Sequence, residues 1–459
     1  MPVRDDPAEQ INDTSISLLA NPGVKIEHED IYRMLLAKGA HPGDAADVVR
    51  IPRQMVTAAI ELCPREVVLS DQRGNVVSQM SQTRPIFWSC PGMAIWHDGR
   101  HRRFTSTDMC NAARLLDRLS NVQVVFGMAM EDVPPPVRDV VGLKHIAANT
   151  SKHARVLCFS PEGAKTVVEM KKVISDRPWL SVGFTAHGPL RWTNLALSIF
   201  QATSGAGIPV SVNGEPMAGV SGPVTLAGSA AVGNAEILAG IVVNQILEPG
   251  RAVIYNLGLA HVFDMKTAIA VTGGPENALF ADLSATMGRF YGLPSASWVS
   301  TESVCPDGQA SAEKMFGFAS HWASGIDHIW GIGQLESEIT FSPAQAVIDN
   351  ELINYVARFR RGASVSQDSL AAGVTRAVGI GGSFLDSEHT LGNFRDEFFM
   401  PELFFRKRRS DWLRAGRREL AARAEEIADN LASQPAETAL SNDQLSELAK
   451  LTDRALSEL

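Results

Sequence analysis

Acidic and aromatic side chains recur at the ends of short β-branched segments in this chain of 459 residues. The acidic ones are Glu215, Glu302, Glu336 and Glu338, and the aromatic ones are Trp298, Trp330, Phe384 and Tyr255, with Trp88 and Trp96 from an earlier segment. Aromatic faces next to a carboxylate form the usual binding site for a quaternary ammonium group. If the fold brings these side chains together, they would recognise a cationic amine. If it does not, the rings fill a core.

Motifs for metal-dependent or nucleophilic catalysis do not occur. The sequence holds no HxH, HExxH or GxSxG pattern. The histidines near strand ends are isolated in sequence, and a lone histidine is more often a structural hydrogen-bonding group. The five cysteines never have CxxC spacing, which favours reduced thiols over a disulfide framework or a zinc site. We therefore predict no metal site.

One glycine-rich segment, GVSGPVTLAG at 219–228, precedes a helical pattern. It could bind an anion at the helix N-terminus. It could instead let a large flat group approach the backbone, because glycine has no side-chain bulk. It could also be an ordinary loop, and the residues leave these three interpretations open.

Eight β-branched segments alternate with helical segments from residue 105 onward. They are 122–127, 155–160, 180–185, 209–214, 251–256, 295–300, 328–333 and 377–382. This alternation predicts an α/β fold, a (β/α)8 barrel, in which chemistry takes place at the carboxyl ends of the strands. An open doubly wound sheet is the alternative, although no GxGxxG follows the first strand.

The regions before and after these units have different patterns. Residues 1–104 combine helical segments with two hairpin signals, at 72–75 and at Asp98-Gly99, and predict an N-terminal cap of helices and a small sheet. Residues 105–405 would form the barrel. Residues 406–459 are charged and helical, and we expect them to pack on the outside of the barrel or against another subunit.

Charge and hydropathy exclude several classes of function. The net charge of −9 argues against a general nucleic-acid-binding protein, because no basic excess is available to neutralise phosphates. No run of eighteen apolar residues predicts a membrane span. The polar start, MPVRDDPAEQ, has no hydrophobic signal region, so we expect a cytoplasmic location.

Long segments of the chain resemble the trimethylamine methyltransferase superfamily, which includes glycine betaine methyltransferases. The resemblance covers almost the whole chain. Its most specific segments are GVSGPVTLAGSAAVGNAEILAGIVVNQ, LESEITFSPAQAVIDNELI and GIGGSFLDSEHTLGNFRDEFFMPELFFR.

This resemblance implies a (β/α)8 barrel that presents an amine to a separate corrinoid protein, whose cobalt(I) accepts a methyl group. The corrinoid (cobalamin) would belong to the partner, and none would be bound permanently. Trimethylamine-specific members carry pyrrolysine, whereas this chain holds only the twenty standard residues. It is therefore similar to the members that act on quaternary amines such as betaines. A quaternary nitrogen already carries the charge that lets an amine leave, so the site has to position the substrate and bind a cation.

Roles follow for the residues at the predicted strand ends. Candidate catalytic carboxylates are Glu215, Glu302 and Glu336. Candidate substrate contacts are Trp88, Trp96, Thr185, His187, Asn213, Tyr255, Trp298, Trp330 and Phe384. Candidate contacts to the partner's corrinoid are Gly222, Gly333, Gly382 and His389.

Local departures from the family pattern bear on the substrate. Glu302, Trp330 and Glu215 lie where relatives carry other residues. Such a site would suit a cation that lacks the betaine carboxylate or carries it farther from the nitrogen. Two other readings stay open: a non-catalytic barrel that binds an amine or a corrinoid protein, and a barrel lyase or aldolase, which would need a lysine at a strand end. We expect a homo-oligomer.

The segment GGSFLDSEHT at 381–390 would follow the eighth strand. Its glycines would let another group approach closely, and Phe384 would form a wall of the pocket. Asp386 or Ser387 would cap a helix that begins near His389. The segment is thus expected to be both a capping turn and part of the barrel mouth.

Overall fold

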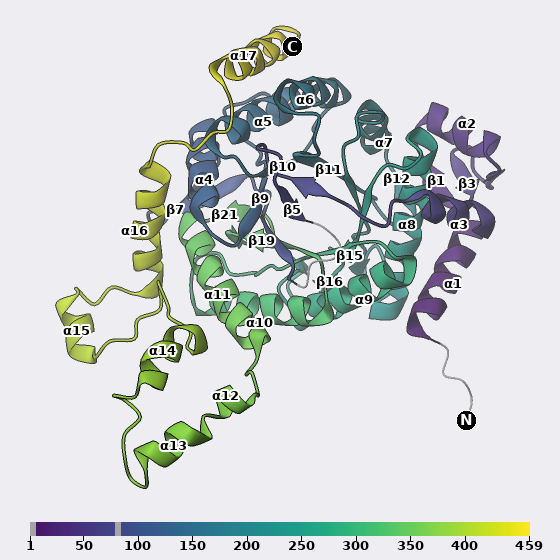
Figure 1. The fold of residues 1–459 in the computed structure, drawn as a ribbon. Helices are drawn as coiled ribbons and strands as arrows, with labels where there is room; N and C mark the ends of the chain where they lie inside the picture. The colour runs from purple at the N-terminus through teal and green to yellow at the C-terminus, as the bar shows by residue number, and fades with distance from the viewer. Residues whose placement is uncertain (1–5, 79–83) are drawn as a thin grey trace, which may run out of the picture.

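A closed barrel of eight parallel strands forms the centre of the protein, whose computed structural model describes residues 6–78 and 84–459 (Figure 1). In chain order the strands are β6 (Ile86–Ser89), β9 (Val122–Phe126), β10 (His153–Val156), β11 (Leu180–Thr185), β13 (Val210–Asn213), β15 (Val253–Gly258), β18 (Ser295–Trp298) and β19 (His328–Ile332). All neighbouring strands pair in parallel, and β6 closes the barrel between β19 and β9. The predicted (β/α)8 barrel is confirmed, and the alternative open sheet is wrong.

The predicted eighth strand is wrong. Seven of the predicted segments overlap barrel strands, but the segment 377–382 contains the end of a helix and a turn, and the side chain of Ile380 there is fully exposed. The eighth strand is β6, from the region predicted to be the cap, and all four of its residues are buried. An exposed glycine-rich turn cannot supply the buried side chains that a barrel strand needs.

Helices surround the barrel. They are α4 (Ser106–Arg118), α5 (Arg138–Asn149), α6 (Pro161–Ile174), α7 (Asn194–Ala202), α8 (Leu226–Leu247), α9 (Pro275–Tyr291), α10 (Gly308–Ser324) and α11 (Pro343–Arg361), with a 3-10 turn at Pro135–Val137. Helix α8 is long and apolar enough to span a membrane. However, 78% of its most apolar window is buried inside the protein, so internal packing accounts for its composition.

The amino-terminal helices pack against α8. Helices α1 (Pro7–Ala20), α2 (Glu29–Ala37) and α3 (Arg53–Leu62) accompany a small sheet made of β1 (Val24–Ile26), β2 (His41–Pro42), β3 (Val48–Arg50) and β12 (Arg191–Trp192). Buried hydrogen bonds attach α1 to the barrel: the Asn234 amide donates to Ser15 Oγ and to the Tyr291 hydroxyl, and the Tyr255 hydroxyl donates to Asn234 Oδ1.

Both predicted hairpins are confirmed. Strands β4 (Leu69–Ser70) and β5 (Val76–Ser78) form the first, which lies at the amino-terminal end of the barrel, where Ser70 O and Ser78 Oγ are hydrogen-bonded to His153 and His328. Strands β7 (Ala94–His97) and β8 (Arg100–Arg103) form the second. Asp98 and Gly99 take φ angles of 51° and 66° in its turn, the left-handed conformation that such turns need.

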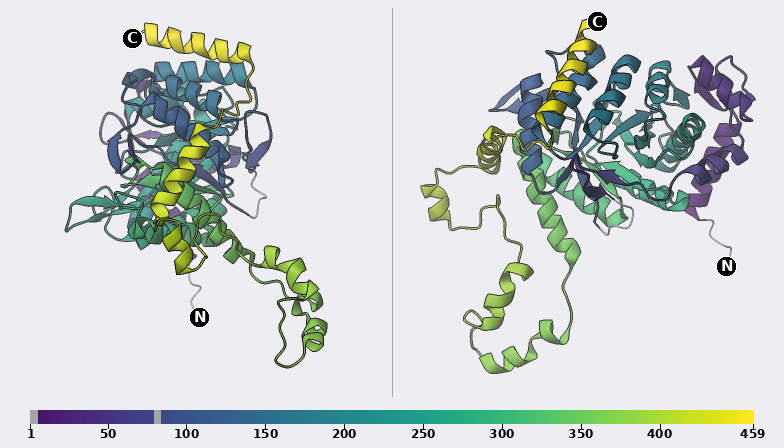
Figure 2. Two further views of the ribbon diagram at one scale, coloured as in Figure 1. Left: turned by 90° about the vertical axis from the view of Figure 1, so that its left-hand side faces the viewer. Right: turned by 45° about the horizontal axis from the view of Figure 1, so that its top comes forward.

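Further short strands extend the loops beyond the carboxyl ends of the barrel strands. Strands β20 (Gln334–Leu335) and β21 (Thr340–Phe341) join β7 and β8 in one sheet. Strands β14 (Met217–Ala218), β16 (His261–Asp264) and β17 (Ile269–Val271) form another. The β16–β17 hairpin projects from one side of the molecule (Figure 2, left).

The carboxyl-terminal part of the chain begins with an arm that leaves the barrel after α11. The arm contains the helices α12 (Gln367–Leu370), α13 (Ala372–Val378), α14 (Glu388–Glu397) and α15 (Arg409–Arg414), and none of them buries a residue. The chain then returns to the barrel, where α16 (Leu420–Ser433) packs on α11 and α4, and α17 (Asn442–Ser457) packs on α6 and α5. These two helices lie on the outside of the barrel, one of the two placements expected for the tail (Figure 2).

Candidate functional site

Polar side chains line the barrel at its carboxyl ends, which we call the mouth. The amide of Asn213 donates to Thr185 Oγ1 at 3.0 Å, and the amide of Asn256 donates to Asn213 Oδ1 at 3.1 Å. Three neighbouring strands, β11, β13 and β15, thus contribute one hydrogen-bonded row. Asn256 Oδ1 is buried and has no partner among the described residues. The row therefore keeps an acceptor free at the mouth.

Two carboxylates, Glu215 and Glu338, lie close enough at this mouth for the charge of Glu338 to raise the pKa of Glu215. Glu215 follows β13 and is half-buried; burial, with the charges of Glu338 and Glu236, raises its pKa to about 8. The charge of Glu338 also contributes to the raised pKa of Cys90, directly after β6. The loop that carries Glu338 lies beside the segment after β6, because the backbone N–H groups of Met93 and Ala94 both donate to Ile339 O.

Glu338 belongs to a loop with an unusual backbone. Glu336, Ser337 and Glu338 have φ angles of 56°, 48° and 84°, three consecutive non-glycine residues in the left-handed region. Such conformations cost energy and persist only where surrounding contacts hold them. Glu338 as a residue is exposed to solvent, yet the protein packed around its carboxylate raises its pKa to about 7. The loop thus holds a partly desolvated acid over the mouth.

Glu302 holds this loop in place. Its carboxylate accepts hydrogen bonds from the backbone N–H and Oγ1 of Thr272, from the Gly273 N–H and from Ser337 Oγ, at 2.5 to 3.2 Å. The backbone N–H of Ser337 also donates to Thr301 O. All of these are contacts within the chain, so the geometry gives Glu302, one of the predicted catalytic carboxylates, the position of an anchor between loops.

Glu336 is likewise occupied by the protein itself. Its carboxylate accepts a hydrogen bond of 2.7 Å from Thr340 Oγ1 and lies 3.5 Å from His101 Nε2. Of the three predicted catalytic carboxylates, only Glu215 has no hydrogen-bond donor among the described residues and faces another acid at the mouth. Glu338, which the sequence placed only on the rim, belongs with it.

The predicted aromatic cage forms in part, and an arginine occupies it. Trp88 and Trp330 stack with ring centroids 5.3 Å apart, and Phe126 packs edge-on against Trp330 at 5.6 Å. The guanidinium carbon of Arg155 lies 5.4 to 5.7 Å from the centroids of these three rings. The cation that the rings contact in this structure is therefore a residue of the chain. Sequence reasoning missed Arg155, although the polar residues His153 and Arg155 alternate in a strand that is otherwise apolar.

Trp298 lies within the mouth, and hydrogen bonds through Gln334 hold its ring. Its indole N–H donates to Gln334 Oε1, and the Gln334 amide donates to Ser300 Oγ at 3.3 Å. Gln334 in turn accepts a bond at its backbone oxygen from Lys314. The predicted residues that the structure places together around the barrel interior and its mouth are Trp88, Thr185, Asn213, Glu215, Trp298 and Trp330.

Several predicted site residues lie elsewhere. Tyr255 points outward from β15 and is hydrogen-bonded to Asn234 of α8, so it belongs to the packing between barrel and helix. Trp96 lies on β7 in the sheet outside the barrel. His187 is exposed in the loop after β11. The predicted convergence of Tyr255 and Trp96 in one aromatic cage is wrong, because side chains on opposite faces of the barrel wall, or outside it, cannot converge.

The segment that carries Gly382, Phe384 and His389 lies in the exposed arm, so its predicted placement at the barrel mouth is wrong. The predicted N-cap of the helix in this segment is confirmed. Ser387 is the N-cap of α14 and accepts a bond from the Thr390 N–H at 3.2 Å. The helix start could be predicted because it depends on local chemistry. The predicted position of the segment was wrong because it depended on the mistaken eighth strand.

The two other predicted cofactor contacts pack within the chain. A Cβ at Gly222 would overlap Ser229 of α8, and one at Gly333 would overlap the ring of Phe341. Gly333 also has a φ of 85°, and its N–H donates to Asp349 at 2.8 Å. Close internal packing therefore accounts for both glycines.

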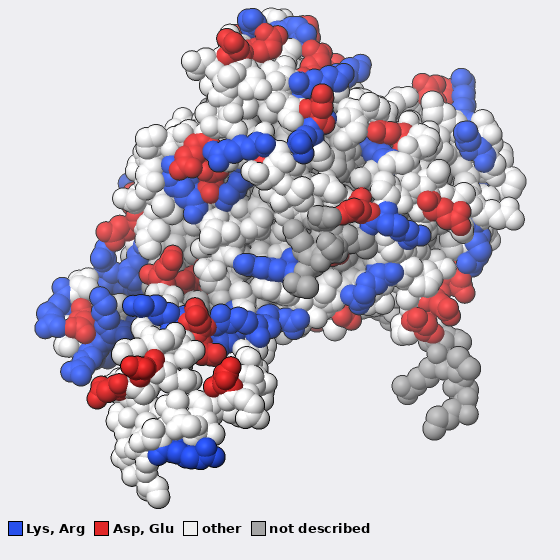
Figure 3. Space-filling view, in the orientation of Figure 1, with Lys and Arg blue, Asp and Glu red and all other residues white. Residues whose placement is uncertain are grey.

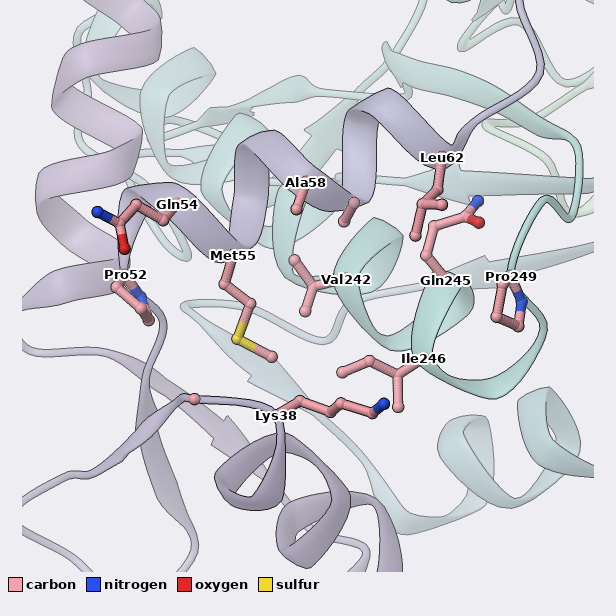
Figure 4. A pocket seen from close by; sticks show the side chains of 12 residues that line it. Lys38, Pro52, Gln54, Met55, Ala58, Leu62, Val242, Gln245, Ile246 and Pro249 are labelled. Carbon is pink, nitrogen blue, oxygen red and sulfur yellow. The ribbon is translucent and has the colours of Figure 1, made fainter.

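A groove of about 420 Å³ lies away from the mouth, between α3, α8 and the end of α2 (Figure 4). Met55, Leu62, Val242 and Ile246 make its lining mostly apolar, and Lys38 and Gln245 lie at its edge. It contains no cluster of ionisable groups, so it offers a surface for contact and no chemistry of its own.

Known proteins of similar sequence and fold identify the family. The sequence matches the family described as trimethylamine methyltransferase (MTTB) over residues 1–459. It is 30% identical over 439 residues to trimethylamine methyltransferase MttB of Desulfitobacterium hafniense (strain DSM 10664 / DCB-2), covering 92% of this chain and 88% of that protein. It is 29% identical over 423 residues to a glycine betaine methyltransferase of Desulfitobacterium hafniense (strain Y51), covering 89% and 87%.

The fold has a counterpart among solved structures. The monomethylamine methyltransferase (MtmB) of Methanosarcina barkeri superposes with a TM-score of 0.53 at 12% identity, covering 100% of this chain and 88% of that one. At this identity the likeness concerns the fold alone. Because the sequence matches this family over all of its residues, the chain belongs to the trimethylamine methyltransferase (MttB) family of methyltransferases.

Proposed function

We propose that this protein transfers a methyl group from a quaternary amine such as a betaine to the corrinoid of a partner protein. The observation that carries the proposal is the pair Glu215 and Glu338 at the mouth, two carboxylates that share a partly desolvated site. Two such acids repel each other when both are ionised, and a cation bound between them relieves that repulsion. Relatives of this chain are named for a tertiary amine, trimethylamine, and for a quaternary amine, glycine betaine.

The proposed reaction needs positioning and little proton chemistry. The bond between nitrogen and the transferred methyl carbon breaks, its electron pair stays on nitrogen, and the product leaves as a tertiary amine. The reduced corrinoid of the partner supplies the nucleophile. The chain's own part is to hold the ammonium group at Glu215 and Glu338 and to direct one methyl group out of the mouth.

The five free cysteines fit a reducing compartment, and we place the reaction in the cytoplasm.

Single-turnover methylation of cob(I)alamin, followed by its visible spectrum, tests this proposal. Betaines of different chain length, trimethylamine and tetramethylammonium would serve as donors. We expect methylation with at least one quaternary amine and a rate roughly 100-fold lower in Glu215→Gln, the size of effect seen when one electrostatic contact to the reacting group is removed. Glu61→Gln, an exposed carboxylate on α3, would serve as a matched control.

The alternative is a barrel that binds an amine or a corrinoid protein without catalysis. Binding of quaternary amines in calorimetry, with no methylation by any donor, would favour that function and reject methyl transfer.

We also propose that the protein acts as a homo-oligomer in which the arm packs on a second copy. Large apolar side chains of the arm are exposed: Val365, Leu370, Ile380, Phe384, Leu385, Leu391, Phe398 and Met400. Much of the arm's surface that is visible in Figure 3 carries neither acidic nor basic residues. Apolar surface of this extent usually marks an interface.

A second copy fits this surface better than the corrinoid partner does. The β16–β17 hairpin, which follows a barrel strand at the mouth, and the arm extend toward opposite sides (Figure 2, left). A partner that docks over the mouth would leave the arm of the same molecule uncovered. A permanent interface between copies also tolerates more apolar surface than a transient one.

A further inference from the structure

Arg155 places a positive charge inside the barrel, and no carboxylate among the described residues pairs with it. The residue is 2% exposed, and its Nη2 donates one hydrogen bond of 2.5 Å, to Ser211 Oγ of β13. Its Nη1 is buried and has no partner among the described residues. Burial lowers the pKa of this guanidinium to about 9, and no carboxylate contributes to that shift. A buried positive charge normally has an anionic partner, because leaving it unpaired is strongly destabilising.

The barrel wall is shaped to admit this side chain. Arg155 begins on β10 and reaches β13, so it passes over β11, the strand between them. A Cβ at Gly183 of β11 would overlap the Arg155 guanidinium. The inward position of β11 at this level thus has no side chain, while Trp88, Phe126 and Trp330 support the guanidinium from the other side. The arginine is held at a defined place below the mouth.

Hydrogen-bonding groups lead from this arginine to the acids at the mouth. Ser211 and Asn213 are alternate residues of β13 and share the inward face, and Glu215 follows two residues after the strand ends. Ser211 contacts Arg155, Asn213 belongs to the polar row, and Glu215 lies at the rim. At about 3.3 Å per residue, the backbone of Asn213 lies roughly 7 Å along the strand from that of Ser211, and Glu215 lies beyond it. The site is therefore positive at its base and acidic at its opening.

We infer that Arg155 binds the carboxylate of a zwitterionic substrate, whose ammonium group lies nearer the mouth beside Glu215 and Glu338. This inference rests on the proposed function and names the residue that selects a betaine over an amine without a carboxylate. In this orientation the methyl groups on nitrogen point toward the opening, where an acceptor can reach them. Nη1 of Arg155 and Oδ1 of Asn256 are both buried and have no partner among the described residues. The carboxylate would satisfy the first through a charge-assisted hydrogen bond.

Calorimetry with matched ligands tests this inference. Glycine betaine and γ-butyrobetaine would each be compared with its methyl ester, which keeps the trimethylammonium group and removes the negative charge. In the wild-type protein we expect at least one acid to bind ten or more times more tightly than its ester, and in Arg155→Met that ratio should fall to about one. Arg155→Lys keeps the charge and should retain part of the ratio.

Two outcomes would overturn the inference. One is that the wild-type protein binds each acid no more tightly than its methyl ester, for both pairs of ligands. This result does not depend on whether any variant folds. The other is an unchanged ratio in an Arg155→Met protein whose melting curve and circular dichroism match those of the wild type. Tetramethylammonium should bind Arg155→Met as it binds the wild type, because it has no carboxylate to lose.

Failure of the inference and failure of the proposed function give different results. Methylation of cob(I)alamin from tetramethylammonium as fast as from either betaine would reject the role of Arg155 and leave methyl transfer standing. An Arg155-dependent preference for the acids, with no methylation by any donor, would reject methyl transfer and leave the carboxylate site standing.

Discussion

Lys314 Nζ lies 2.6 Å from a carboxylate oxygen of Asp349, and both side chains are completely buried. Lys314 also donates to the backbone oxygens of Gly331 and Gln334 at 2.7 and 3.0 Å, and the Gly333 N–H donates to Asp349. The ion pair thus fixes the backbone at the end of β19, directly before the loop that carries Glu338. Burial raises the pKa of Asp349 even though Lys314 lowers it, so the ionised form of the Asp349 carboxylate depends on the charge of Lys314.

We expect Lys314→Met to lower the free energy of unfolding by about 3–5 kcal/mol, because it leaves the buried Asp349 carboxylate without a counter-charge. Differential scanning calorimetry would measure the loss. The double variant Lys314→Met, Asp349→Leu should regain much of the melting temperature, since no unpaired charge remains. A single variant as stable as the wild type would show that the pair does not hold this part of the barrel.

Glu302→Gln tests whether this carboxylate is an anchor. Glutamine keeps the shape but loses the charge and one acceptor oxygen, so the bonds from Thr272, Gly273 and Ser337 weaken. We expect a lower melting temperature, a loss of about 1–3 kcal/mol, and a loop at 336–338 that is cleaved faster in limited proteolysis. Unchanged stability together with a complete loss of methyl transfer would instead give Glu302 the catalytic role expected from the sequence.

The affinity for a quaternary amine should rise between pH 6 and pH 9. A cation binds best when Glu215 and Glu338 are ionised, and their pKa values of about 8 and 7 keep them protonated at the lower pH. Binding should therefore release protons, which calorimetry in buffers of different ionisation enthalpy would detect. In Glu215→Gln, the increase in affinity near pH 8 should be absent. An affinity independent of pH in the wild type would contradict the placement of the ammonium group.

The raised pKa of Glu215 also makes the stability of the protein without ligand depend on pH. Glu215 binds its proton more tightly in the folded protein, at about 8, than in the unfolded chain, near 4.5. Its contribution is fully present below pH 4.5 and is lost as pH rises through 8. The melting temperature of the wild type should thus fall more between pH 6 and pH 9 than that of Glu215→Gln, and equal falls would show an ordinary, solvated carboxylate.

Replacing apolar residues of the arm should dissociate the oligomer. The triple variant Ile380→Ser, Phe384→Ser, Leu385→Ser removes apolar surface from a segment that contributes nothing to the core. Light scattering after size exclusion should report a smaller particle with an unchanged melting curve at low concentration of protein. Equivalent substitutions at the exposed Val220 and Val224, outside the arm, serve as the control. A triple variant with the mass of the wild type would reject the role of the arm.

The sequence by itself determined the repeating units and the local signals. Seven barrel strands, both hairpin turns and the Ser387 cap depend on alternation, on left-handed turn residues and on a hydroxyl at a helix start, and all of these act within a few residues. The family could also be predicted, because its segments are long and continuous. Glu215 was found for the same reason, as an acid directly after a strand.

Only the tertiary structure decided which strand closes the barrel and where the charges meet. The segments 86–89 and 377–382 both have strand-like composition, and burial alone distinguishes them. Tyr255 and Arg155 both lie on barrel strands, yet the first points outward to Asn234 and the second points inward to Ser211. That choice follows from the inward or outward face of each strand position in a closed barrel, which depends on pairing between residues distant in the sequence.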